Sequence, residues 1–406
     1  MYCFPTEGTG KQNAADAASL AGGGAATQYL EANNIHYSNW NCSGNVINAM
    51  NIAENTAISR ASSNDVVIDY DLSDQNGVDA QCSSYPKKYI DVITQVAAET
   101  RTSFAHLLFD QPLEQTVEAV TRVYARLPFG SGNAIVALNE EVCDLGTNGA
   151  TFTGDSEVHL TGGGVLSNGC LTGEGNALIV DVNSGEVTYG EENQVTHPEK
   201  FTPSPQPGMP INPDTFDVFP EPNCSAVPDL GDFQTGGSQP LWELEPGRYT
   251  NITVEHPTVM KSGLYCLTGD FVIAGNGTLG VDPYNGINGV TIYLISGGFS
   301  TQGSNEVNIY APPVSPNPSP AIPDVLIFMA PGNTNQVILT GNSSSTYTGI
   351  VYAPDGDIEA RGSEVGIGFN TALVGNNVYV RGEAYMEISY FQSPQNGTPT
   401  FLELHK

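Results

Sequence analysis

The stretch VLIFMAPGNTNQVILTGNSSSTYTGIVYA, residues 325–353, holds three short apolar segments, VLIF, VIL and GIVYA, separated by corners rich in Gly, Asn and Ser. Short apolar runs bounded by turn residues are typical of β-strands. Segments of the same kind recur after about residue 130, for example at 158–160, 177–180 and 290–294. No helical period interrupts them. We therefore predict a mostly-β region from residue 131 to the end of the chain.

Glycine-rich corners indicate which β architecture to expect. The pentapeptides TGGGV (161–165) and LTGNS (339–343) repeat an apolar-x-Gly pattern, and Gly and Asn tolerate the left-handed corners that stacked coils require. Many short, evenly spaced strands without helices between them are typical of a β-solenoid or a β-sandwich. We expect a β-helix-like solenoid, with the sandwich as the alternative.

Prolines divide this β region. The stretch 198–240 holds ten of the 27 prolines, and we interpret it as a linker or insertion. Residues 131–197 are then expected to form a first β-solenoid segment, and residues 241–406 a second β-solenoid segment. Another proline cluster, 312–323, is expected to loop off one coil.

The first 130 residues have a different texture, which predicts a small α+β domain. Ala14, Ala18, Ala21 and Ala25 recur at helical spacing, although the glycines at 22–24 should weaken that helix. A second small-residue helix follows near residue 46, and alternating strands follow at 90–96 and 117–125. The alanine stripe predicts either packing within the chain or self-association with other copies.

Charge and composition exclude several classes of protein. The chain has 406 residues with 13 Lys and Arg against 44 Asp and Glu, a formal net charge of −31. Such a chain does not bind nucleic acid through its phosphates. With 39% apolar residues it is not a disordered protein either. No apolar run is long enough to predict a transmembrane helix.

Seven cysteines are widely spaced and form no C-x-x-C motif, which argues against zinc knuckles and redox motifs. We predict disulfides between successive partners, at separations of 40, 27 and 42 residues, with Cys3 left over. Oxidised pairs predict an extracellular or cell-surface protein. The predicted pairs are Cys42/Cys82, Cys143/Cys170 and Cys224/Cys266.

Catalytic and metal motifs are weak. The six histidines are scattered, no P-loop or dinucleotide fingerprint exists, and the acidic segment 69–77 lacks the first ligand of a calcium loop. We therefore expect no cofactor and no metal. One carboxylate cluster could form the active site of a solenoid carbohydrate-active enzyme. It consists of Asp355, Asp357 and Glu359 with Arg361. Its Asp355-Gly356 pair is also typical of a plain turn between two strands. A glycan-binding module could instead use Tyr379, Tyr385 and Tyr390.

The segment KQNAADAASLAG, residues 11–22, resembles the signature of the bacterial TadE/TadG-like family, which is associated with tight-adherence pili. The β-rich remainder is similar to extensions of larger Tad-domain proteins. In that family the signature follows a membrane helix, whereas this sequence opens almost directly on the signature, so we expect either a processed or truncated product or a soluble relative. The resemblance implies a non-enzymatic structural or adhesive surface protein, a homo-oligomer or pilus-like homopolymer, with other pilus or cell-surface components as further partners.

Overall fold

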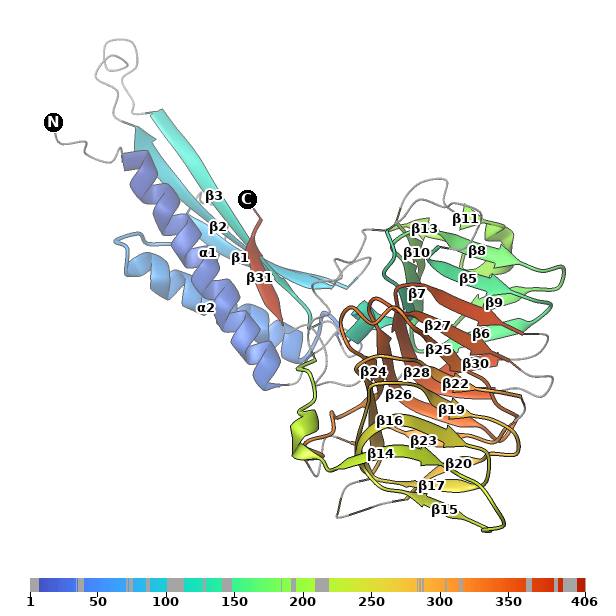
Figure 1. Ribbon diagram of the computed structural model, residues 1–406. Helices are drawn as coiled ribbons and strands as arrows, with labels where there is room; N and C mark the ends of the chain where they lie inside the picture. Colours follow the sequence, from blue (N-terminus) through green and yellow to red (C-terminus); the bar gives the residue numbers. More distant parts are fainter. Residues whose placement is uncertain are drawn as a thin grey trace. The chain divides into compact units, whose positions relative to one another are not determined.

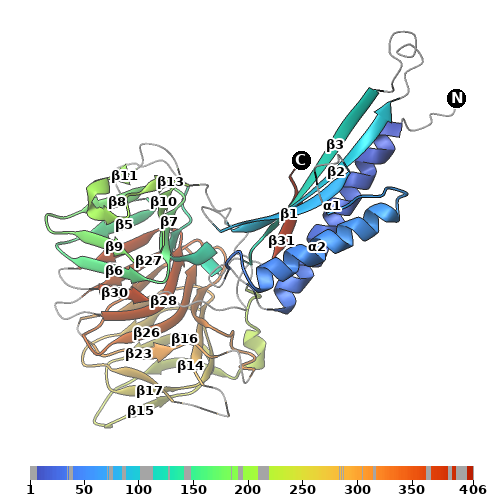
Figure 2. The same cartoon turned by 180° about the vertical axis from the view of Figure 1, so that it is seen from behind.

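The computed structural model divides into two compact units, Met1–Pro128 with Gly397–Lys406 as unit 1, and Phe129–Asn396 as unit 2. Figures 1 and 2 show the elements of both units. The described residues are 7–33, 35, 40–70, 72, 76–84, 88–100, 113–126, 129–140, 148–183, 185–190, 195–208, 219–282, 284, 286, 288–303, 305–313, 317–362, 367–382, 386–389 and 400–405.

Unit 1 packs two helices on one antiparallel sheet of order β1-β2-β3-β31. Its final strand comes from the far end of the chain, so the expected boundary at residue 130 misses the last element of this unit. The long β2–β3 hairpin forms the centre of the sheet. The elements are α1 (Glu7–Ala32), α2 (Asn45–Ser62), β1 (Gly77–Ser83), β2 (Tyr89–Thr100), β3 (Leu113–Tyr124) and β31 (Phe401–Leu404).

Helix α1 is continuous through its glycines, contrary to the expected weakening. The reason is close packing: a Cβ atom at Gly22 would lie 2.7 Å from the Ala53 carbonyl oxygen of α2. Ser19 Oγ donates to the Val92 carbonyl of β2 and contacts Thr121 Oγ1 of β3 at 2.6 Å. Small residues therefore let α1 lie against α2 and the sheet together.

Unit 2 consists of parallel strands in three rows, which we call rows A, B and C. Every described strand pair in this unit is parallel. Consecutive strands visit rows A, B and C in turn, so three strands make one layer and the next layer stacks on it. Some long strands, such as β16 (Gly247–Val254) and β26 (Thr346–Ala353), contribute residues to two rows.

In stacking order, row A contains β14 (Asp229–Gln234), β16 (Gly247–Val254), β18 (Gly263–Leu267), β21 (Val290–Leu294), β24 (Val325–Met329), β26 (Thr346–Ala353), β28 (Ile367–Gly375), β4 (Asn133–Ala137), β7 (Gly164–Ser167), β10 (Val187–Tyr189) and β13 (Gln206–Pro207). Row B contains β14, β16, β19 (Phe271–Ile273), β22 (Phe299–Thr301), β25 (Gln336–Leu339), β27 (Asp357–Arg361), β29 (Val378–Arg381), β5 (Ala150–Thr153), β8 (Leu171–Glu174) and β11 (Val195–Thr196).

Row C contains β15 (Trp242–Leu244), β17 (Thr258–Lys261), β20 (Leu279–Asp282), β23 (Asn308–Tyr310), β26, β28, β30 (Met386–Ser389), β6 (Glu157–Thr161), β9 (Ile179–Val182) and β12 (Phe201–Thr202). Short 3-10 helices lie at η4 (Phe129–Gly132), η5 (Pro198–Lys200) and η7 (Cys224–Ala226).

The chain enters this stack in its middle. Strands β4 to β13 build one half outward, and the chain then returns to begin the other half at β14. The second half ends with β28, β29 and β30, which pair with β4, β5 and β6. We call this junction the seam. The proline-rich stretch therefore does not separate two independent β regions, because the two expected segments share one stack (Figure 1).

Side chains that point inward from the three rows form one long apolar core, with aromatic pairs such as Phe152–Phe201 and Phe271–Phe299. Row A is also covered on its outer side. Phe219, from the returning segment, packs on Phe129, Phe328 and Tyr352 there. All five residues of β24 are consequently buried.

Candidate functional site

Row B carries the carboxylate cluster on adjacent strands of the stack. Glu359 of β27 is only 3% exposed, and its Oε1 and Oε2 accept hydrogen bonds from Arg361 Nε (2.9 Å) and Nη2 (3.0 Å). Arg381 of β29 is the register partner of Arg361, and its Nη1 lies 3.4 Å from Glu359 Oε1. One buried carboxylate therefore lies between two half-exposed guanidinium groups.

The neighbouring side chains fix this arrangement. Gln336 Nε2 donates to Glu359 Oε2 at 3.3 Å, and the Arg381 guanidinium lies 5.1 Å from the centre of the Tyr379 ring. The hydrogen bond that Arg361 donates to the Glu359 carboxylate raises the pKa of Arg361. Burial, followed by the nearby Asp357 charge, raises the pKa of Tyr379. The cluster is an ion-pair network, without a described acid–base pair facing a substrate space.

The two other predicted acids do not join it. Asp355 is exposed and its Oδ2 accepts the Gly332 amide at 2.7 Å. Asp357 Oδ1 accepts from Asn377 Nδ2 at 2.8 Å. The Gly356 amide donates to the Ala353 carbonyl, which makes 353–356 a turn between β26 and β27. Of the four predicted catalytic candidates, the structure brings together only Glu359 and Arg361.

The structure describes one of the three tyrosines predicted for glycan binding. Tyr379 is half-buried on row B, and the Arg381 guanidinium stacks on its ring. Tyr385 and Tyr390 lie outside the described residues. The sequence analysis missed Arg381 because this residue lies one layer away from Glu359. Arg381 ends the segment VYVR as Arg361 ends DIEAR, and this similarity could have indicated that the two arginines are neighbours.

Two predicted disulfides are present. Cys42–Cys82 joins the segment before α2 to β1, with an S–S distance of 2.00 Å, and Cys224–Cys266 joins η7 to β18. Cys170 is also disulfide-bonded, whereas its predicted partner Cys143 and the leftover Cys3 lie outside the described residues. The Cys224 bridge fastens the returning segment to row A.

The alanine stripe of α1 splits in the structure. Ala14 and Ala18 are 3% and 0% exposed in the core of unit 1, while Ala21 and Ala25 are half-buried. Two of the four predicted self-association residues are thus occupied by contacts within their own unit. An Ala18→Glu variant would disturb this core and cannot isolate an effect on assembly.

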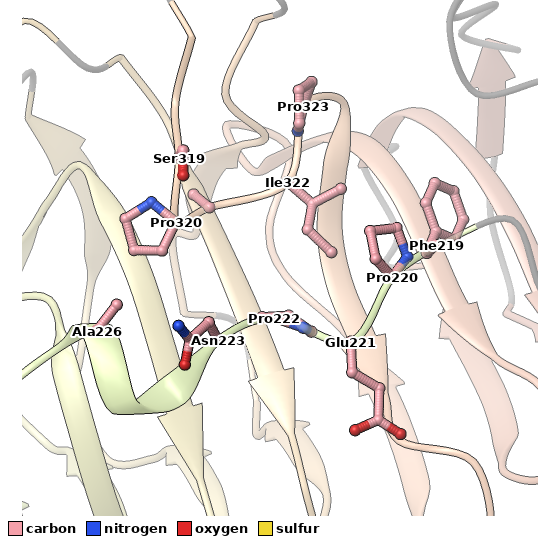
Figure 3. Close-up of a pocket in the computed structure, with 11 residues that line it drawn as sticks. Phe219, Pro220, Glu221, Pro222, Asn223, Ala226, Ser319, Pro320, Ile322 and Pro323 are labelled. Carbon is pink, nitrogen blue, oxygen red and sulfur yellow. The ribbon is translucent and has the colours of Figure 1, made fainter.

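A groove of about 370 Å³, which sequence analysis did not foresee, lies where the returning segment meets the second proline cluster. Figure 3 shows Pro220 and Pro222 on one side and Pro320, Ile322 and Pro323 on the other. Among the described residues that line it, Glu221 alone carries an ionisable side chain. Burial and then the Glu221 carboxylate raise the pKa of the adjacent Tyr293 to about 12. The groove is mainly apolar, and its described lining offers no acid–base pair.

Among the residues that the structure describes, no group of three or more His, Cys, Asp or Glu side chains is arranged to hold a metal ion. His159 lies 3.6 Å from both Glu157 and Asp181 on row C. Neither described helix is long and apolar enough to cross a membrane. Comparison with protein-family models, curated proteins and solved structures finds no match to this chain.

Proposed function

We propose that this chain is an extracellular, non-enzymatic structural or adhesive protein of a bacterial surface. In this proposal unit 1 is a Tad-like domain and unit 2 is a β-solenoid that it carries. The parallel pairing of unit 2 favours the solenoid over a sandwich, whose sheets are antiparallel. The disulfides favour an oxidising compartment.

The observation that carries the non-enzymatic proposal is the use of the acids in row B. Glu359 is neutralised by two arginines, Asp357 is held by Asn377, and Asp355 accepts a backbone amide. Glycoside hydrolysis needs two carboxylates that face each other across a substrate. Each of these three acids has a structural partner instead.

The Tad-like signature supports the domain proposal through its packing. Its small residues Ala14, Ala18 and Gly22 are buried where α1 meets the sheet and α2. Packing within one domain therefore explains why this segment consists of small residues. A pilus-like polymer rests on the family resemblance alone.

Electron microscopy and sedimentation of the native protein test the polymer. Filaments that persist on dilution are expected for a pilus-like subunit, and single particles at every concentration would contradict it. The rival enzyme is tested with pectate and alginate as substrates. Measurable cleavage that is lost in Arg361→Ala, but retained in the matched surface variant Arg248→Ala, would overturn the non-enzymatic proposal.

A further inference from the structure

Helix α2 has an exposed face that consists of amide and hydroxyl side chains. The helix buries one stripe against the rest of unit 1, namely Val46, Ala49, Ala53, Ala57 and Ala61. The residues on its opposite side are exposed and uncharged: Asn45, Asn48, Asn51, Asn55, Ser59 and Ser62. At 3.6 residues per turn these positions fall within an arc of about 120°, so they form one continuous surface. We call this surface the asparagine face.

Helix stability does not explain the asparagine face. Asparagine is a weak helix former because its side chain competes with the backbone for hydrogen bonds. Alanine, glutamate or lysine at these exposed positions would favour α2 more strongly. Four asparagines on one side of a single helix therefore oppose the local propensity of that helix. Residues that break a local rule in this way are expected at functional sites.

Charged residues are scarce around the asparagine face, although the whole chain carries a net charge of −31. Helix α2 contains two ionisable residues, Glu54 and Arg60. Glu54 faces β1, where its Oε1 accepts the Ala80 amide at 3.0 Å, and Arg60 lies in the last turn. The next acidic residue along the chain is Asp65, beyond the end of the helix. A surface without charge in such an acidic chain suits an uncharged ligand.

An exposed aromatic ring lies beside the asparagine face. Among the residues that the structure describes, Val67 and Tyr70 are the most exposed large apolar side chains, at 80% and 60%. The Tyr70 hydroxyl donates to Asn55 Oδ1 at 2.6 Å, which places this tyrosine next to the face. Single exposed apolar residues are ordinary on a protein surface. A tyrosine next to a row of asparagines instead combines a rigid ring with adaptable hydrogen-bonding groups, as binding surfaces do.

The chemistry of this surface fits a neutral carbohydrate. A sugar hydroxyl both donates and accepts hydrogen bonds, and each asparagine amide offers two donor protons and an acceptor oxygen. The C–H face of a sugar ring can pack on the apolar face of an aromatic ring such as Tyr70. A second copy of the chain has the same charge of −31 and is repelled at long range, whereas an uncharged polymer is not.

We propose that the asparagine face of α2, together with Tyr70, is a binding site for a neutral glycan. Asn48, Asn51 and Asn55 would hydrogen-bond sugar hydroxyls, and the ring of Tyr70 would pack on one sugar. The inference rests on the adhesive part of the proposed function and deepens it by naming the ligand class. Its outcome is separate from that of the polymer. Single particles in electron microscopy would leave glycan binding standing, and absence of glycan binding would leave filament formation standing.

The test measures retention of the full chain on three immobilised neutral polysaccharides, dextran, mannan and galactan, with polygalacturonate as the acidic counterpart. We expect retention on at least one neutral polysaccharide, with equal affinity between about 50 and 500 mM salt, because no ion pair contributes. Retention on none of the three, or stronger retention on polygalacturonate, would overturn the proposal. Retention that falls steeply as salt rises would also contradict an uncharged ligand.

Asparagine variants separate binding from folding. Asn51→Ala should raise the thermal unfolding midpoint, because alanine favours the helix, and should lower glycan affinity about threefold or more. A merely structural role would not move the two quantities in opposite directions. The matched control is Asn13→Ala, at an exposed position of α1, which should raise the midpoint without a change in affinity. Equal affinity losses in these two variants would overturn the proposed site.

Tyrosine variants test the aromatic part of the site. Tyr70→Ala should lower glycan affinity about tenfold or more, because the ring is removed. The matched control is Tyr284→Ala, from a tyrosine of unit 2 that is 37% exposed, and its affinity should equal that of the parent. Unchanged affinity in folded Tyr70→Ala would contradict the proposal. A dimer that dissociates in Asn51→Ala would assign the asparagine face to a second copy of the chain instead.

Discussion

Single side chains show how an acidic chain uses its few cations. Lys261 lies between Asp282 and Glu243, at 3.0 and 3.4 Å, and Arg122 forms a bidentate pair with Asp91 while it stacks 3.9 Å from the Tyr89 ring. Glu359 reverses the ratio, with two arginines for one acid. Because Glu359 is buried, loss of a cation should reduce stability more at this cluster than at the other ion pairs.

Removal of the Arg361 charge and removal of the Glu359 charge should lower the free energy of unfolding to different extents. Arg361→Met leaves a buried carboxylate with weaker compensation, and we expect a loss of about 2–3 kcal/mol in the free energy of unfolding. Glu359→Gln leaves half-exposed guanidiniums in water and should cost about 1 kcal/mol. Urea unfolding measures both, with Arg248→Met, from an exposed pair, as a near-neutral control. Equal losses in the first two variants would contradict this account of Glu359.

Buried tyrosines should limit stability at high pH. Burial raises the pKa of Tyr265, Tyr249 and Tyr347, and raises that of Tyr293 to about 12. Because the neutral form is protonated, the folded state retains protons that the unfolded state releases above about pH 10. The stabilisation is complete below that pH and is lost as the pH rises through the folded-state pKa values. Thermal unfolding between about pH 8 and 12 measures this loss. In Tyr347→Phe the dependence should be shallower, and an unchanged slope would exclude Tyr347 as a contributor.

Helix α1 shows how an element can override intrinsic propensity. Three consecutive glycines disfavour a helix, yet α1 runs from Glu7 to Ala32 without interruption. Contacts with β2, β3 and α2 supply the missing stabilisation. A Cβ at Gly22 would meet α2 and β2, whereas no described atom lies within 4 Å of a Cβ placed at Gly24.

Alanine at these two glycines should act in opposite directions. Gly22→Ala would push against the Ala53 carbonyl oxygen and Val92 Cγ1, so we expect a loss of about 1–3 kcal/mol despite better helix propensity. Gly24→Ala should gain about 0.5–1 kcal/mol. Thermal unfolding followed by circular dichroism compares them. Stabilisation by Gly22→Ala would show that the close approach is not required.

Local sequence patterns predicted elements better than their partners. The run VTIYL is β21 itself, and the turn at Gly356 follows from its dipeptide. In contrast, β4 pairs with β28 through Ile135 and Leu373, and nothing in either apolar segment distinguishes this partner from the many similar ones. Strand β31 is four residues long and carries no periodic signal. Glu359 and Arg361 share a strand face by simple alternation, whereas Arg381 required the register of the next layer.

The whole of unit 2 depends on the seam between its two halves. Asn377 Oδ1 accepts from the Gly149 amide at 2.7 Å and from Asn139 Nδ2 at 3.0 Å, both in the first half. Asn377 Nδ2 donates to Asp357 in the second half. One buried amide thus joins segments that are more than two hundred residues apart in sequence.

Asn377→Ala should weaken the seam selectively. It leaves the buried Gly149 amide without its partner, and we expect a loss of about 1–3 kcal/mol with faster hydrogen exchange in β5 and β29. Asn333→Ala is the control, because the Asn333 amide bonds to Leu294 and Gly297 within the second half. Faster exchange at the seam in both variants would show a general effect.

Entry at the middle of the stack has a consequence for biosynthesis. A chain that emerges N-terminus first exposes β4 with only one neighbour, and β28 follows after more than two hundred further residues. The sheet of unit 1 is completed later still, because its fourth strand, Phe401–Leu404, follows β28 in the chain. Truncation before β28 therefore leaves unit 2 without its seam and unit 1 without β31. Loss of β28 and β31 would expose unpaired strand edges in both units, where a protease could cleave the chain.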